Sequence, residues 1–179
     1  MSAALLLVRT DAAAGEARAV ADARALARAA PDLARLQVCI ALDRPLAYIY
    51  AWGKALSACD GAKRLSPIAE WRGASAGEQA PYHYVVATDI ETGWEDELNT
   101  WYQDEHMPGL AAVPGNVSCA RLRSMDGTPR YHACYDLVSP AVLERREWLA
   151  VRHTEWSSRV RPHFRNTQRI MFRTVLDDR

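Results

Sequence analysis

Three side chains that can handle a proton or a hydrogen bond fall at helical spacing in the second half of the chain. Tyr102 lies four residues before His106, and Asn99 lies three residues before Tyr102. Residues three and four apart lie on one face of a helix, so these three form a polar stripe. An imidazole, a phenol and an amide in one line can bind a small polar ligand and protonate it. The spacing predicts acid–base chemistry, with His106 and Tyr102 as the catalytic residues and Asn99 as a substrate-binding residue.

The helix that carries this stripe is expected to begin near Thr92 and to end near His106. Thr92 and Glu95 have the spacing of a capping box, in which each side chain satisfies a free backbone amide at the helix start. Pro108 has no amide proton and restricts the residue before it, which predicts that the helix stops near His106, apart from a loose turn that could extend it to Val113. Pro108 and Gly109 are expected to open the helix end, so that a ligand can reach the imidazole. His106 would then lie in the last turn, where the helix dipole favours a protonated imidazole. A histidine that only caps the helix fits the same place, so spacing alone leaves both interpretations open.

The residues around this stripe resemble a known family motif. W-Y-x-x-E-H-x-P-x-L, followed by V-P-G, runs from Trp101 to Gly115. It is similar to the motif of EthD-like proteins of the dimeric α/β-barrel superfamily, and the resemblance extends over roughly residues 81–176. The resemblance implies ferredoxin-like units paired across a barrel-like interface, with the ligand site at the motif. Members range from degradation-pathway proteins to polyketide cyclases and dehydratases, so the motif does not name one reaction.

The order of the expected elements indicates the same fold class. The second half reads strand, helix, strand, strand, helix, strand, which is the ferredoxin-like order, and the first half repeats it with a stunted second helix. We therefore expect an α+β chain of tandem ferredoxin-like βαββαβ units that form a dimeric α/β-barrel-type pseudodimer. A degenerate unit would span residues 1–74 and an EthD-like unit residues 80–179, joined by the Gly-, Ala- and Ser-rich residues 71–81. The expected strands are residues 3–8, 33–41, 46–52, 64–71, 82–89, 117–123, 131–137 and 167–176, and the expected helices are residues 14–30, 54–59, 92–106 and 140–160.

Composition excludes several classes of function. The 22 basic and 22 acidic residues balance, so no basic excess points to nucleic acid or a membrane surface. The four cysteines form no C-x-x-C pair, and no signal peptide or membrane-spanning run is recognisable, which favours a reduced, cytoplasmic setting. No dinucleotide, P-loop or hydrolase motif occurs. We expect a small-molecule substrate and no metal or other cofactor, and further pairing into a homodimer stays open.

Further residues are candidates for the substrate site. Trp101 and Glu105 form a stripe beside the first one, and we predict that both contact the substrate. We also include His132 among the predicted substrate-binding residues, although the alternation of its strand does not decide which face it occupies. A metal site made of Glu105, His106 and His132 lacks any of the usual ligand spacings, so it is not favoured.

Three functions remain open at this point. The leading one is a cofactor-free enzyme acting on a small apolar or aromatic carbonyl compound by His106 acid–base catalysis, of lyase, cyclase, dehydratase or isomerase type. The second is a non-catalytic accessory protein that binds a small molecule in the same pocket. The third is a haem- or oxygen-linked monooxygenase, which the resemblance implies because relatives on this fold carry out such chemistry.

Overall fold

A computed structural model describes residues 4–13, 15–30, 32–53 and 62–178 of the chain. The first half contributes β1 (Ala4–Asp11), α1 (Glu16–Ala29), β2 (Leu33–Ala41), β3 (Leu46–Gly53) and β4 (Ala62–Arg72). The short helix expected over residues 54–59 lies outside the described residues.

The second half repeats this order and adds a larger helical layer. It runs through β5 (Tyr82–Ile90), α2 (Glu95–Trp101), a π-helical turn η1 (Tyr102–His106), α3 (Met107–Ala111), β6 (Asn116–Ser124), β7 (Tyr131–Leu137), η2 (Pro140–Glu144), α4 (Arg146–Arg152), α5 (Glu155–Val160), η3 (Arg161–His163) and β8 (Phe164–Asp178). Ser139 caps η2 by accepting a hydrogen bond from the amide of Ala141 at 3.2 Å, and Pro140 occupies the first helical position.

The eight described strands close into one antiparallel barrel in the order β1-β3-β2-β8-β5-β7-β6-β4. This order is two ferredoxin-like sheets, β4-β1-β3-β2 and β8-β5-β7-β6, joined along the seams β2–β8 and β4–β6. The last strand of each half pairs with the second strand of the other half. The predicted fold class, a tandem ferredoxin-like pseudodimer, is therefore confirmed.

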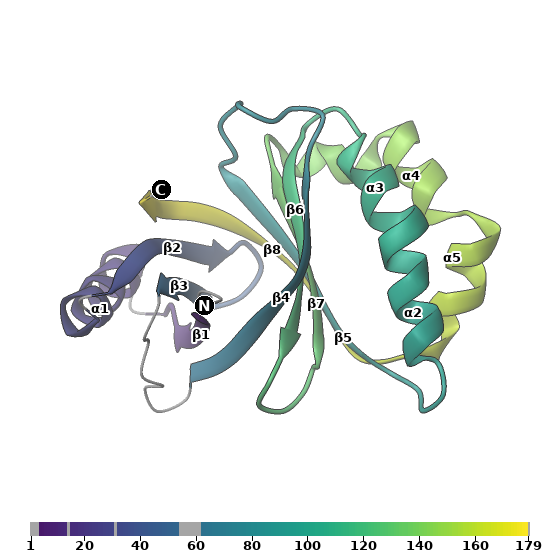
Figure 1. Cartoon of the computed structure of the whole chain (residues 1–179). Coiled ribbons are helices and arrows are strands. Elements are labelled where there is room, and N and C mark those ends of the chain that lie inside the picture. Colours follow the sequence, from purple (N-terminus) through teal and green to yellow (C-terminus); the bar gives the residue numbers. More distant parts are fainter. Residues whose placement is uncertain (1–3, 14, 31, 54–61, 179) are drawn as a thin grey trace.

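Buried apolar side chains of the described residues form three layers. One lies inside the barrel, between the two sheets. A second lies between the sheet of the second half and the helices α2 to α5, and the third lies between the sheet of the first half and α1 (Figure 1). The side chains of each strand alternate between the barrel interior and a helical layer. Each sheet face of the second half can consequently carry its own site.

Strand β4 is longer and better paired than its sequence predicts. Proline lacks the amide proton of a ladder bond and favours edge strands, yet β4, which contains Pro67, pairs with β1 on one side and β6 on the other. A register shift between Pro67 and Ala69 accommodates the missing amide proton, because a bulge leaves one residue unpaired.

The segment after β4 is tied to the second half. The amides of Gly73 and Ser75 donate to the carbonyls of Val117 and Asn116 at 3.0 and 2.9 Å. A Cβ at Gly73 would lie 2.1 Å from the carbonyl oxygen of Asn116, so only glycine allows this close approach. The domain boundary between residues 74 and 80 stays a prediction. No helix among the described residues is long and apolar enough to cross a membrane.

Candidate functional site

The helix that carries His106 continues past Pro108, contrary to the sequence prediction. After α2 the chain widens into the π-helical turn η1, in which the amide of Met107 donates to the carbonyl of Tyr102, five residues back. The chain then continues as α3 to Ala111. The wider turn makes room for the proline ring, which would otherwise clash with the carbonyl four residues before it.

The start of this helix also differs from the prediction. The capping residue is Trp94, no side chain caps the amides, and Thr92 lies in the preceding turn. Glu95 is used elsewhere: its carboxylate accepts a hydrogen bond from the hydroxyl of Tyr131 and forms an ion pair with Arg130. The predicted capping box does not form, because Tyr131 on the neighbouring β6–β7 hairpin binds the carboxylate of Glu95 instead.

His106 is buried against the aromatic side chains of its own helix. Its ring stacks on Trp101 with centroids 4.2 Å apart, and it meets the ring of Tyr102 edge-on at 5.4 Å. Only 8% of the residue is exposed, and its Nδ1 atom has no hydrogen-bond partner in the described part of the chain. Burial, followed by the charges of Arg161, Arg152 and Arg121, lowers the pKa of His106 to about 3. The expected protonated imidazole is thus corrected to a neutral one, because arginines and desolvation outweigh the helix dipole.

A buried arginine, not foreseen from the sequence, joins the polar stripe. Arg121 of β6 is 1% exposed and donates from Nη2 to Oδ1 of Asn99 at 3.0 Å. Its guanidinium lies 4.3 Å from the centroid of the Tyr102 ring. No carboxylate of the described residues forms an ion pair with it. The available sequence signal was a charged residue in the middle of an apolar strand.

The second predicted stripe binds the helices to each other. Glu105 accepts a hydrogen bond from the indole nitrogen of Trp101 at 3.2 Å and from the hydroxyl of Thr154 at 2.6 Å. Thr154 in turn caps α5 by accepting from the amide of Ser157. Glu105 therefore has structural partners on two helices, whereas Trp101 faces the histidine.

His106 and Tyr102 line a narrow space between the sheet and the helices. Its volume is about 40 Å³, close to the room that one water molecule occupies. Three arginines (Arg152, Arg161 and Arg169) also line it, and no carboxylate does so among the described residues. Burial, which the arginine charges partly oppose, raises the pKa of Tyr102 to about 12, so its hydroxyl stays protonated. The space therefore combines a neutral imidazole base, a phenol that can donate a hydrogen bond, and an excess of positive charge.

The opening at Pro108 through which the sequence predicts that a ligand reaches His106 is closed. Gly109 lies inside α3, and a Cβ there would lie 3.0 Å from both methyl groups of Val151 on α4. The helix end was expected to open at Pro108 and Gly109, but close packing of α3 against α4 seals this side instead.

His132 faces away from the helices. Its strand neighbours Tyr131 and Ala133 pack in the helical layer, while Cys134 packs inside the barrel, so alternation places His132 on the barrel side. His132 does not line the space around His106. The prediction that it contacts the same substrate is therefore not supported by its position. Burial, with a smaller effect of Lys63, lowers its pKa to about 4.

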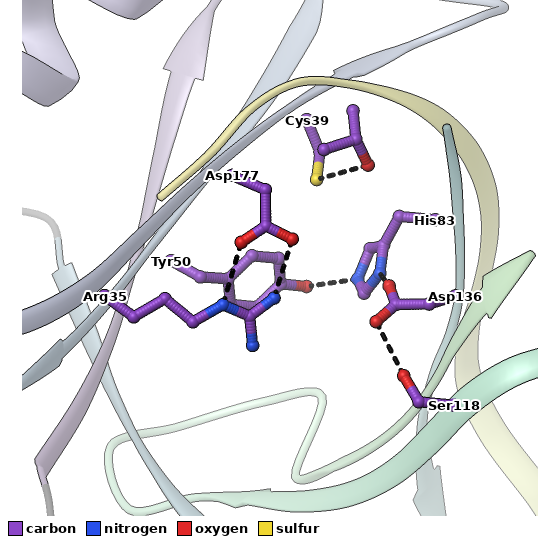
Figure 2. A network of polar contacts seen from close by, with 8 residues as sticks. Arg35, Cys39, Tyr50, His83, Ser118, Asp136 and Asp177 are labelled. Atoms are coloured by element: carbon purple, nitrogen blue, oxygen red, sulfur yellow. Dashed lines mark hydrogen bonds and ion pairs between the residues drawn. The ribbon is translucent and has the colours of Figure 1, made fainter. Parts of the chain in front are cut away.

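A second buried histidine occupies the barrel face of the same sheet (Figure 2). His83 of β5 bonds through Nδ1 to Oδ1 of Asp136, its cross-strand neighbour on β7, at 2.8 Å. The other carboxylate oxygen accepts a hydrogen bond from the hydroxyl of Ser118 at 2.8 Å, and Nε2 of His83 lies 3.3 Å from the hydroxyl of Tyr50. Burial lowers the pKa of His83, but the bonds and charges of Asp136 and Cys134 outweigh it and raise the pKa to about 10. His83 is therefore an imidazolium at neutral pH.

This network borders the larger of the two spaces, a cavity of about 440 Å³ at one end of the barrel. His83 is not among the residues that the sequence predicts for the site. The signal available was a histidine within an otherwise apolar strand. Its partner lies 53 positions away, and only the strand register brings the two together.

The described residues contain no group of three histidine, cysteine or acidic side chains arranged to hold a metal ion. Cys39, Cys119 and Cys134 are free and buried.

No protein-family model matches the sequence, and no curated protein matches it. Solved structures share the fold. One, named a "putative monooxygenase", from Lactobacillus acidophilus, is 8% identical with a TM-score of 0.67, covering 98% of this chain and 94% of that chain. An "anthrone oxidase-like protein" is 12% identical with a TM-score of 0.68, covering 98% of this chain and 92% of that one.

A third structure comes from Listeria monocytogenes. It is a ferredoxin-fold protein related to antibiotic biosynthesis monooxygenases, 8% identical with a TM-score of 0.61, covering 96% of this chain and 95% of that chain. At these identities the likeness establishes the fold alone, which is ferredoxin-like. Membership of the EthD-like family stays a prediction.

Proposed function

We propose that this protein is a cofactor-independent enzyme that moves a proton on a small apolar or aromatic carbonyl compound, with His106 as the acid–base group. The observation that carries this proposal is the unpartnered Nδ1 of a neutral, buried imidazole beside a phenol donor. A buried nitrogen without a partner costs stability, which a structural cap would avoid by bonding the helix carbonyls.

The charges around His106 favour a substrate that becomes anionic. Removing a proton next to a carbonyl places negative charge on the carbonyl oxygen. Arg152, Arg161 and Arg169 line the space, and the protonated hydroxyl of Tyr102 can donate a hydrogen bond to that oxygen. Fixed positive groups in a site with little water stabilise such an oxyanion strongly.

The same arginines make the basicity of His106 depend on whether an anionic ligand is bound. Burial and the arginine charges hold the pKa of His106 at about 3, too low for an efficient base at neutral pH. An anionic ligand would neutralise part of the arginine charge and so raise this pKa toward the working range. The imidazole then becomes a better proton acceptor only when a suitable compound is bound.

Substrate binding requires the space to widen. A volume of about 40 Å³ does not hold an aromatic molecule. Of the three lining arginines, Arg152 and Arg161 are half-buried and Arg169 is exposed, and their long side chains can swing outward. Rotation of these side chains is the smallest change that would admit a ligand.

After the proton has left, two outcomes are chemically consistent with the same residues. In the first, the enolate closes a ring or expels a leaving group, which is lyase or cyclase chemistry. In the second, the carbanion reacts with O₂, so that a CH₂ group and O₂ give a carbonyl group and water, with the substrate itself supplying the electrons. The names of the fold neighbours, a "putative monooxygenase" and an "anthrone oxidase-like protein", favour keeping the second outcome.

A panel of aromatic ketones and anthrones tests the proposal. We expect wild-type protein to exchange the α-proton for deuterium or to convert a member of the panel, and His106→Asn to do so at least ~100-fold more slowly. Asn keeps a polar group of similar width, so circular dichroism is expected to show an intact fold. Comparing turnover in air and under argon separates the two outcomes. If His106→Asn works at the wild-type rate, the site is a binding pocket and the accessory-protein function replaces the enzyme.

A further inference from the structure

The barrel cavity has the size and lining of a ligand site. At about 440 Å³ it falls within the range of small-molecule pockets, roughly 300–1,000 Å³. Strands from both halves line it, among them β2, β3 and β4 of the first half and β5, β6 and β7 of the second. It therefore exists only because the two units close around it.

One wall carries a connected polar network (Figure 2). Asp136 accepts from Ser118 and pairs with His83, whose other nitrogen faces the hydroxyl of Tyr50, and all four residues line the cavity. The chain of contacts holds each group in one orientation, as a binding site requires. With His83 protonated, its Nε2 donates to the oxygen of Tyr50, so a ligand oxygen placed at the end of the network would accept from the Tyr50 hydroxyl.

The barrel does not require this ion pair for its packing. His83, the second residue of β5, pairs across the sheet with Asp136 of β7. At the equivalent position of the first half, Leu5, the second residue of β1, pairs with Trp52 of β3. The first unit thus builds the same part of the barrel with two apolar side chains. A buried ion pair adds little net stability over apolar residues of similar size, so its presence in only one unit points to a role other than packing.

The charges and rings of the lining indicate the class of ligand. His83 is paired with Asp136 and Arg35 with Asp177, the latter by two hydrogen bonds of 2.9 and 3.0 Å. Glu70 and Arg72 add one charge of each sign to the lining, so its charges balance. Trp52 and Trp71 also line the space, as do apolar residues of β6. Tryptophan faces favour flat rings, and a charge-balanced lining gives no preference for an ion.

We propose that the barrel cavity is a second small-molecule site, which binds an uncharged aromatic compound bearing a hydroxyl or carbonyl group against Tyr50 and His83. It lies on the face of the sheet opposite His106. Its occupation is therefore separate from the proposed reaction, and either proposal can fail without the other.

The test uses 2-naphthol, which is uncharged at pH 7, and 2-naphthoate as an anionic comparator of the same shape. Calorimetric titration is combined with NMR of the histidine ring signals. We expect 2-naphthol to bind the full-length wild-type protein at one site and to shift the signals of His83 while leaving those of His106 in place. At this site 2-naphthoate is expected to bind at least ~10-fold more weakly.

Two variants and a matched control locate the binding. Ala120→Phe fills the cavity from β6 and is expected to weaken binding of 2-naphthol at least ~10-fold, because the ring takes the ligand's space. Tyr50→Phe removes only the hydroxyl and is expected to weaken it about 3- to 10-fold. His106→Asn, on the other face, is expected to bind like wild type.

Three outcomes would overturn the proposal. The first is no binding of 2-naphthol by the wild type up to about 1 mM. The second is wild-type affinity in Tyr50→Phe with the His83 signals unmoved. The third is a loss of binding in His106→Asn together with shifted His106 signals, which would place the compound under the helices. If Ala120→Phe does not fold, Tyr50→Phe and the His83 signals decide the matter.

Discussion

Both faces of the second sheet bury histidines, and His106 under the helices differs in charge from His83 inside the barrel. His106 under the helices is 8% exposed and His83 inside the barrel is 4% exposed, so their burial is nearly the same. The pKa of His106 falls to about 3, whereas that of His83 rises to about 10.

The neighbours, not the depth, account for this difference. His83 bonds to Asp136, while His106 faces arginines and leaves Nδ1 without a partner in the described part of the chain. Burial disfavours the charged form of both rings, and only a carboxylate within bonding distance reverses it. Two sites of one sheet are thereby suited to different ligands, an anion-forming one on the helix side and an uncharged one inside the barrel.

The largest change is expected from removing the carboxylate that distinguishes the two histidines. In Asp136→Asn only the effect of Cys134 still opposes the desolvation of His83, so we expect its pKa to fall from about 10 to below its ordinary value of 6.5. NMR titration of the ring signals measures it. Ser118→Ala, which removes one hydrogen bond to the carboxylate but keeps its charge, serves as the matched control and is expected to leave His83 protonated at pH 7. A pKa that stays near 10 in Asp136→Asn would mean that another group holds the proton.

The next effect concerns stability on the two sides of pH 6.5. The raised pKa of His83 gives stability that is complete below 6.5 and is lost as the pH rises toward 10. The lowered pKa of His106 acts in reverse, because the unfolded chain binds a proton below 6.5 that the folded chain refuses until about 3. Each group contributes a slope of at most about 1.4 kcal/mol per pH unit.

Urea unfolding as a function of pH separates these two slopes. We expect His83→Gln to flatten the alkaline side between pH 6.5 and about 7.5, where cysteine thiols with an ordinary pKa of about 8.5 are still mostly protonated. His106→Asn is expected to flatten only the acid side. If both variants keep the wild-type slopes, neither histidine has a pKa that differs between the folded and the unfolded chain.

A smaller shift is expected from weakening the positive charge near His106. Among the neighbouring charges, that of Arg161 lowers the pKa of His106 most. We expect Arg161→Gln to raise this pKa by about one unit or less, measured by NMR titration. Arg169→Gln is the matched control, because Arg169 lines the same space but is not among the charges that shift His106. Equal shifts in both variants would point to a diffuse field, with no special part for Arg161.

The smallest effect is expected from Tyr102→Phe. The ring keeps its contact with Arg121, and only the hydroxyl is lost, so turnover of a panel substrate is expected to fall by less than ~10-fold. A steady-state comparison with His106→Asn measures the difference. A loss as large as that of His106→Asn would make the phenol, and not the imidazole, the principal proton donor.

The sequence by itself determined the repeated βαββαβ order, most strand positions and the placing of Tyr102 beside His106. These features follow from local periodicity: alternation marks strands such as Tyr131–Leu137, and the four-residue spacing on a helix fixes which side chains are neighbours. Local rules failed where a distant group competed. Tyr131 took the carboxylate of Glu95 from the helix start, and a π-helical turn carried the helix through Pro108.

Only the tertiary structure decided the charge of the buried histidines and the face of His132. His83 and Asp136 lie 53 positions apart in the sequence, and their pairing depends on the register of β5 and β7. The hydrophobic pattern shows which face of a strand is buried, but a register shift of two residues keeps the same face buried and leaves the pattern unchanged. The neutral state of His106 likewise depends on Arg121 and Arg161, which other elements deliver. Electrostatic effects act through space over several ångströms, so residue types alone cannot assign a pKa until the fold has placed the charges.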